Sequence, residues 1–144
     1  MKNKKKQQKF KPLEHTADIG ISVRGKTLEE LFENASYGMF SILVENLNEV
    51  LPLKKLNVSI QGIDKESLLI NYLNELLYIY STKKIVFSKF KIKINKNKLK
   101  SIIFGEKFNS KKHIIYNEIK AATYHNLKIK QYNNMFSTQI IFDV

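Results

Sequence analysis

Residues 19–45, IGISVRGKTLEELFENASYGMFSILVE, change from the repeat of a strand to the repeat of a helix within one segment. Apolar residues at 19, 21 and 23 alternate with small or polar ones, which predicts a half-buried strand ending near Gly25. Thr27 and Glu30 have the spacing of a capping box, the pair that starts a helix. Apolar residues at helical spacing follow: Leu28, Leu31, Phe32, Ala35, Met39, Ile42 and Leu43. We therefore predict a strand and then a helix over residues 28–45.

A second unit of the same kind follows. Apolar residues at 56, 58 and 60 predict a strand that ends near Gly62, and Asp64 is a suitable N-cap for a second helix. That helix has one apolar stripe: Leu68, Leu69, Tyr72, Leu73, Leu76, Leu77 and Tyr80. Both helices are amphipathic, so each needs a surface to pack against.

The remainder of the chain predicts sheet. Residues 90–94 alternate apolar residues with lysines, and residues 95–97 suit a hairpin turn before a return strand over 99–104. Further strands are expected over 119–129 and 136–142, with a turn at 133–134. The order is strand, helix, strand, helix and then four strands. It predicts an α+β fold in which two amphipathic helices pack on a mainly antiparallel β-sheet or on a sandwich of sheets.

The composition is that of one domain. The chain has 144 residues, of which 43% are hydrophobic, and it contains no cysteine. Disulfides and thiol chemistry are therefore excluded. No apolar run approaches the ~18 residues that would span a bilayer, and no secretory signal precedes the first strand. We expect a cytoplasmic protein with a disordered basic tail at residues 1–12, a domain over residues 13–144 and no membrane contact.

The net charge of +12 raises the question of nucleic-acid binding. Six lysines lie in the first eleven residues, and Arg24 is the only arginine. Arginine is favoured for bidentate recognition of phosphate and guanine, so a generally solvated surface explains the charge better. A face that binds RNA would interleave aromatic and basic residues, whereas residues 89–94 place them on opposite faces. A weak RNA contact through the basic tail remains an alternative.

The acidic residues at the two ends of the domain suggest a metal site. Asp18 begins the first strand and Asp143 ends the last one, and chain ends often lie close together. With the terminal carboxylate of Val144 they would supply hard oxygen ligands for Mg²⁺ or Ca²⁺. The alternative is that both aspartates cap turns and stay apart, and spacing alone favours this alternative.

Other polar residues form no complete catalytic set. His15 and His125 are the titratable candidates, and Glu106 and Lys120 lie in strand-like surroundings. Each has an ordinary structural explanation. There is no glycine-rich phosphate loop and no recognised nucleophile motif.

Several motifs together resemble the archease family, from about residue 13 to residue 144. They are EHTADIG at 14–20, TLEELFENA at 27–35, GMF at 38–40, LNELL at 73–77, GE at 105–106, KAATYH at 120–125 and FDV at 142–144. The resemblance covers nearly the whole domain, with the motifs in order and at compatible spacings.

The resemblance implies a function that composition does not. Archeases assist the RtcB-type RNA ligase of tRNA splicing by promoting guanylylation of the ligase and its multiple turnover. The family's metal site would fall on Asp18, Asp143 and Val144, with calcium as the expected ion and magnesium or manganese as alternatives. Glu14, His15, Glu106, Lys120 and His125 would support or extend that site.

Two other functions stay open. The resemblance also implies a chaperone or specificity modulator of a tRNA cytosine methyltransferase. A stand-alone metal-dependent hydrolase is the third candidate, although the sequence shows no complete nucleophile and base. We therefore expect a protein cofactor of an RNA ligase rather than an enzyme.

Overall fold

The computed structural model describes residues 9–13 and 18–144. The first strands and helix are β1 (Phe10–Pro12), β2 (Ile19–Gly25) and α1 (Leu28–Leu43), followed by a short 3-10 helix (Leu47–Glu49). Next come β3 (Lys54–Gln61), α2 (Lys65–Lys83), β4 (Ile85–Asn95) and β5 (Lys98–Lys107). The chain ends with β6 (Ala121–Thr123), β7 (Lys130–Tyr132) and β8 (Met135–Asp143). The predicted α+β class is confirmed.

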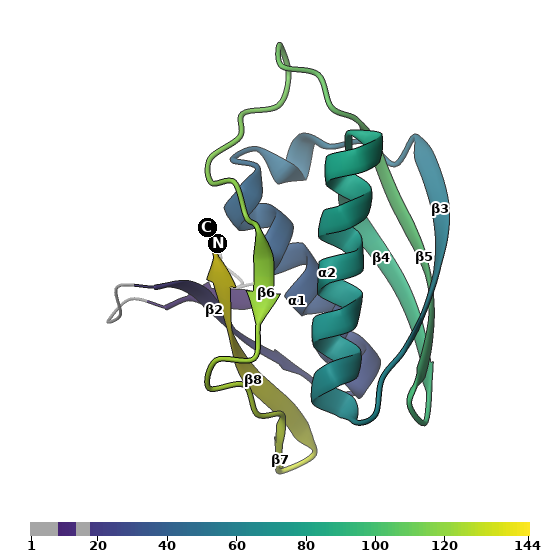
Figure 1. Cartoon of the computed structure of the whole chain (residues 1–144), viewed down its shortest axis with the longest axis vertical. Helices are drawn as coiled ribbons and strands as arrows, with labels where there is room; N and C mark the ends of the chain where they lie inside the picture. The colour runs from purple at the N-terminus through teal and green to yellow at the C-terminus, as the bar shows by residue number, and fades with distance from the viewer. Residues whose placement is uncertain (1–8, 14–17) are drawn as a thin grey trace, which may run out of the picture.

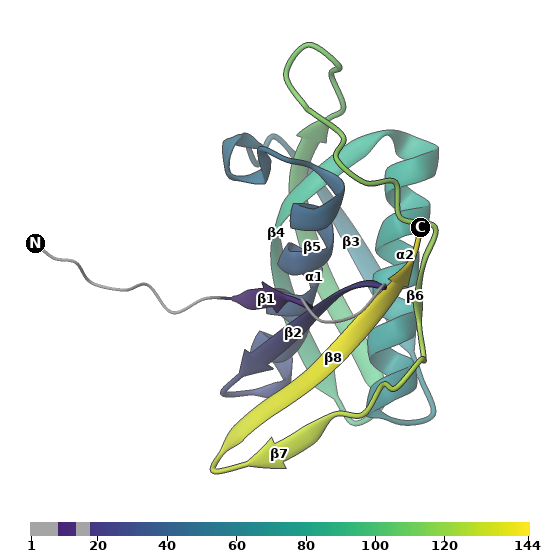
Figure 2. The ribbon, with the colours of Figure 1, turned by 90° about the vertical axis from the view of Figure 1, so that its left-hand side faces the viewer.

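The strands form two separate antiparallel sheets. The larger sheet has the order β1-β2-β8-β6, with β7 also paired to β8, and the smaller one has the order β3-β5-β4. Figure 1 shows β3 and β5 on one side of the helices and β2, β8 and β6 on the other. Figure 2 shows the same layers turned by 90°, with α1 between β4 and the β1–β2 pair.

Helix α1 is buried on two opposite sides because a sheet lies against each. On one side Gly38 faces Ile21 of β2, and a Cβ added there would come within 2.8 Å of the Ile21 side chain. On the other side the Phe40 ring stacks on Phe90 of β4, with 5.9 Å between ring centroids. Gly38 and Phe40 are two positions apart, and residues at that spacing point in directions about 200° apart around the helix axis. The hydrophobic core therefore surrounds α1.

The predicted helix starts are confirmed by their hydrogen bonds. The Glu30 backbone N–H donates to Thr27 Oγ1 (3.0 Å), and the Glu30 carboxylate accepts from the backbone N–H of Lys26. At α2, the Ser67 backbone N–H donates to Asp64 Oδ1 (2.8 Å), and Ser67 completes a capping box. Helix α1 ends at Leu43, two residues before the predicted end, because Val44 is extended and bridges Ile115.

Two sequence predictions were wrong in extent. The strand expected over 119–129 is paired only over Ala121–Thr123, because a turn follows in which Asn126 has a φ of 56°. Ile119 and Ile129 are buried outside any strand. Residues 10–12, assigned to the disordered tail, instead form β1 and pair with β2. Residues 1–8 of that tail lie outside the described residues.

Gly105 of β5 lies opposite a bulge in the neighbouring strand β4, where a larger residue does not fit. The register between β4 and β5 shifts between Phe87 and Lys89, and Gly105 pairs with Phe87 at that shift. A Cβ at Gly105 would collide with the carbonyl oxygen of Val86. This obstacle is backbone, so it cannot move aside as a flexible side chain would.

We expect Gly105→Ala to lower the free energy of unfolding by at least about 2 kcal/mol, since it overpacks a rigid backbone contact. Urea unfolding followed by circular dichroism measures this difference. Lys98→Ala, at the exposed start of the same strand, is the control and should change stability by no more than about 0.5 kcal/mol. Equal stability of the two variants would show that the backbone at the bulge adjusts freely.

Candidate functional site

The strand register brings Asp18 and Asp143 to the same end of the larger sheet. Ile19, the first residue of β2, pairs with Phe142 of β8, and the two strands are antiparallel. Asp18 directly precedes Ile19 and Asp143 directly follows Phe142, so both aspartates lie at this end of the β2–β8 ladder. Both residues are exposed. Like charges at opposed positions of a sheet repel, which favours a cation or hydrogen-bond donors between them.

Two further groups lie at this end, which we call the acidic tip (Asp18, Lys120, Asp143 and Val144). The backbone N–H of Lys120 donates to the carbonyl oxygen of Asp143 (2.7 Å), and Ala121 of β6 pairs with Asp143. Val144 follows Asp143 and is 49% exposed. Figure 2 shows the end of β8 beside β6.

The donor set of the acidic tip fits a hard divalent cation. Its anionic side chains are the carboxylates of Asp18 and Asp143, which are oxygen ligands, and a terminal carboxylate at Val144 stays a prediction. Within residues 9–13 and 18–144, no three His, Cys, Asp or Glu side chains converge as a metal site. An ion at the tip would therefore need the terminal carboxylate, water or a ligand from a partner. The metal site stays a prediction.

The remaining candidates are distributed over the molecule. Glu14 and His15 lie outside the described residues. His125 is exposed in the turn after β6, where its backbone N–H donates to Thr123 Oγ1 (3.3 Å). Glu106 lies on β5, in the other sheet, where its carboxylate binds Lys112 of the β5–β6 loop.

Glu106 is the centre of a polar cluster with the buried His113 and the half-buried Lys112. Its Oε2 lies 2.8 Å from Lys112 Nζ and 2.8 Å from His113 Nε2. Glu106 is 7% exposed and His113 is 3% exposed. The backbone N–H of Asn109 donates to His113 Nδ1 (2.9 Å), so the ring proton belongs on Nε2, facing Glu106. The cluster ties the β5–β6 loop to its own sheet.

This cluster shifts the titration of its carboxylate. Burial alone would raise the pKa of Glu106, but hydrogen bonds from Lys112, His113 and the backbone of Leu51 hold the pKa below its ordinary value. His113 was not among the histidines considered from sequence. It lies seven positions after Glu106, across a loop, so no local motif links the two.

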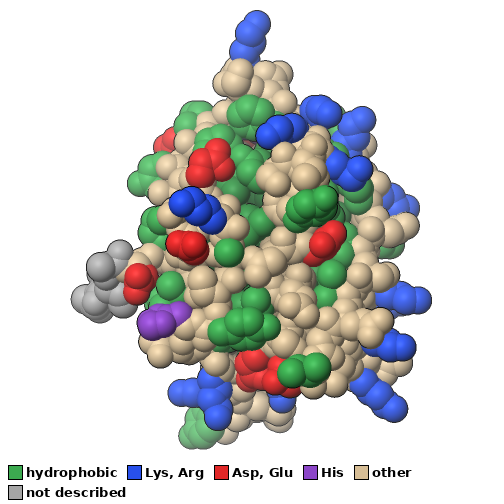
Figure 3. All heavy atoms as spheres, in the orientation of Figure 1, with side chains coloured by type: hydrophobic (Ala, Val, Ile, Leu, Met, Phe, Trp, Pro, Cys, Tyr) green, Lys and Arg blue, Asp and Glu red, His purple; other side chains and the backbone are tan. Residues whose placement is uncertain are grey.

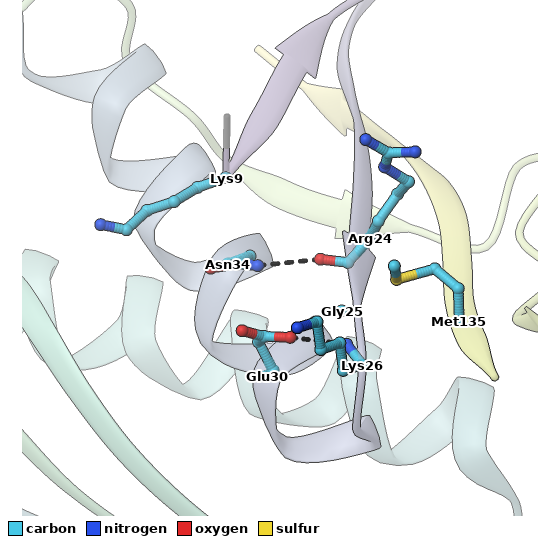
Figure 4. A pocket seen from close by; sticks show the side chains of 7 residues that line it. All are labelled: Lys9, Arg24, Gly25, Lys26, Glu30, Asn34 and Met135. Atoms are coloured by element: carbon cyan, nitrogen blue, oxygen red, sulfur yellow. Dashed lines mark hydrogen bonds between the residues drawn. The ribbon is translucent and has the colours of Figure 1, made fainter. Parts of the chain in front are cut away.

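A small hollow of about 210 Å³ lies at the opposite end of the β2–β8 ladder from the acidic tip. Lys9, Arg24 and Lys26 line it, together with Glu30 and Asn34 from the first turns of α1 (Figure 4). The Asn34 side chain donates to the carbonyl oxygen of Arg24 (2.8 Å), and Glu30 binds the Lys26 backbone. These bonds fix the turn between β2 and α1.

A test of the Glu106 cluster is the pH dependence of stability. Glu106→Gln should lower the free energy of unfolding at pH 7 by about 1–3 kcal/mol, because it removes a charged acceptor from buried donors. The folded pKa is depressed, so this stabilisation is present above the unfolded pKa and is lost as pH falls through the folded pKa. Urea unfolding at several pH values should show wild type and variant converging in acid.

Glu45→Gln, at an exposed position, is the matched control and should leave the pH profile unchanged. A constant difference between wild type and Glu106→Gln at every pH would contradict an electrostatic role for the cluster.

The sequence matches known proteins over almost its full length. The model of the Archease protein family matches residues 10–144. A protein archease of Pyrococcus furiosus is 39% identical over 136 residues, covering 91% of this chain and 95% of the relative. One of Sulfurisphaera tokodaii is 37% identical, covering 95% of this chain and 99% of the relative.

Solved structures show the same fold. The solution structure of protein 1598 of Methanobacterium thermoautotrophicum is 34% identical, covers 96% of this chain and all of its own, and has a TM-score of 0.84. The crystal structure of a Thermotoga maritima protein, described as an archease and possible chaperone, is 26% identical. It covers 93% of this chain and 96% of its own, with a TM-score of 0.67. This chain belongs to the archease family.

Proposed function

We propose that this protein is a protein cofactor, not an enzyme, of an RtcB-type RNA ligase in tRNA splicing. It would promote guanylylation of the ligase and thereby multiple turnover. Membership of the archease family supports the general role. The specific role in ligase activation is supported by the pairing of Ile19 with Phe142. This pairing leaves two exposed carboxylates, those of Asp18 and Asp143, at one end of the larger sheet.

The acidic tip is suited to act at a nucleotide site of the partner. Asp18, Asp143 and Val144 would hold a calcium, magnesium or manganese ion, and a bound divalent ion neutralises charge on nucleotide phosphates. Strand β8 pairs with β2 on one side and with β6 on the other, and the pairing of Asp143 with Ala121 fixes the backbone of this last residue of β8. The Lys120 N–H bond to Asp143 adds to this fixation. A preorganised ligand set loses little entropy when the complex forms.

A second function is supported by one neighbour. The Thermotoga maritima protein is described as a possible chaperone. By analogy, this chain would modulate the specificity of a tRNA cytosine methyltransferase. The ligase proposal has the more specific physical basis, since a chaperone role requires no paired carboxylates at an exposed strand end.

The central test is a guanylylation and multiple-turnover assay of the cognate ligase. Asp18→Asn and Asp143→Asn should each reduce the stimulation by about ten- to a hundredfold, as expected when a metal ligand or its support is removed. Glu45→Gln, an exposed change of the same chemistry, should stimulate like wild type. Full stimulation by both aspartate variants would contradict the proposal.

A binding measurement separates the metal site from activity. A saturating divalent ion at about 100 times its Kd should stabilise the wild-type protein by about 2.7 kcal/mol. Thermal unfolding with CaCl₂, MgCl₂ or MnCl₂ should show this stabilisation for wild type and Glu45→Gln, and not for the two aspartate variants. If wild type fails to stimulate the ligase but alters methyltransferase selectivity, the second function is the correct one.

A further inference from the structure

The smaller sheet has an exposed face that is rich in lysine. Its strands turn Val58, Phe90 and Ile103 toward the helices, so alternate residues point to the opposite, outer face. Six lysines lie on that face: Lys55, Lys89, Lys91, Lys93, Lys98 and Lys100. Figure 3 shows lysine and arginine side chains along the edge of the molecule that β3 and β5 occupy in Figure 1. We call this surface the lysine face.

The register places an aromatic and an aliphatic residue among these lysines. Phe104 pairs with Lys55 on one side and Lys89 on the other. Ile102 likewise lies between Asn57 and Lys91 in the next row. Both apolar side chains are half-buried. Alternation within residues 89–94 suggested that the lysines share no face with aromatic residues, and the paired strand β5 shows that this was wrong.

The lysine face is also hollowed. A depression of about 460 Å³ lies over the centre of the sheet, within the range of ligand-binding pockets. Lys91, Lys93, Lys100 and Ile102 line it. Glu33 of α1 also lines it, and its carboxylate accepts a hydrogen bond from the Ile92 backbone N–H (3.1 Å). That carboxylate is therefore already engaged with the edge of the sheet.

We propose that the lysine face binds single-stranded nucleic acid, with phosphates on the lysines and a base on Phe104. Alternate residues of a strand are about 6.8 Å apart, so lysines 89, 91 and 93 form a cationic row along β4 that an extended backbone can follow. Single strands expose base faces that stack on aromatic rings, whereas bases in a duplex are already stacked. An acidic protein would use the charge but would not need the aromatic platform.

The ring of Phe104 is available to a base at small cost. The Nζ atoms of Lys89 and Lys91 lie over it, 5.4 and 5.7 Å from its centroid. Exposed cation–π contacts of flexible lysines are weak, and a base stacked on the ring covers more of it. A base can therefore displace the two ammonium groups, which then contact phosphates. The lysine ammonium group is a point charge. We therefore expect the face to recognise the phosphate backbone and the stacked base, and not the base sequence.

The lysine face does not depend on the function proposed for the acidic tip. It lies on the sheet that contains neither Asp18 nor Asp143, on the side away from the helices. Loss of nucleic-acid binding and loss of ligase stimulation are thus separate outcomes of separate variants.

The test is fluorescence anisotropy of the full chain with labelled oligouridylate and oligothymidylate, each about 12 nucleotides long. Replacing Lys89, Lys91 and Lys93 by Gln should reduce the slope of log K against log salt by about 0.7 for each phosphate that the variant no longer neutralises. Phe104→Leu should weaken binding about fivefold to a hundredfold and leave that slope unchanged. Comparison of the two probes shows whether the 2′-hydroxyl contributes.

The matched control replaces three other exposed lysines, Lys111, Lys128 and Lys130, by Gln, which gives the same net charge. Circular dichroism checks that each variant is folded. Equal loss of binding in the two triple variants would reduce the effect to net charge and overturn the proposal. Unchanged binding by Phe104→Leu, or equal competition by polyglutamate, would also overturn it and favour an acidic protein partner.

Discussion

Burial of α1 on two opposite sides is the constraint on which the rest of the structure depends. One side must accept the larger sheet closely, which the absence of a side chain at Gly38 allows. The other side must fill space against the smaller sheet, which Phe40 does with edge and stacked contacts to Phe87 and Phe90. The carboxylates of Glu29 and Glu33 also bind backbone N–H groups of β4, an edge strand. These bonds satisfy donors that would otherwise be open to another chain.

The sequence predicted the helix starts correctly, because the residues that determine each start are neighbours in the sequence. The residues that cap α1 and α2 lie within three positions of their partners, so sequence alone locates the helix starts. The segment 119–129 shows the opposite case. It contains enough apolar residues for a strand, but Ile119 and Ile129 are buried from loops, and only three residues pair with β8. Apolar residues indicate that a segment is buried, but they do not by themselves show that it pairs with another strand.

Contacts between residues far apart in the sequence also limited what could be predicted of the candidate functional surfaces. Asp18 and Asp143 were candidates because each flanks or ends a strand with a clear pattern, yet their placement at one end of the sheet required the β2–β8 register. The Glu106–His113 contact depends on the path of a loop, which no periodicity describes. Phe104 joins the lysines of β4 only through cross-strand pairing. Residue types were readable from sequence, whereas their neighbours across strands were not.

The two-sheet architecture also separates the lysine face from Asp18 and Asp143. Helix α1 lies between the sheets, and a helix with its side chains is about 10–12 Å across. That thickness already exceeds the Debye length of about 8 Å at physiological ionic strength. The lysines on the outer side of the smaller sheet therefore neutralise little of the charge on Asp18 and Asp143. A chain with a net charge of +12 can thus keep two exposed carboxylates, those of Asp18 and Asp143, that the lysine face hardly neutralises.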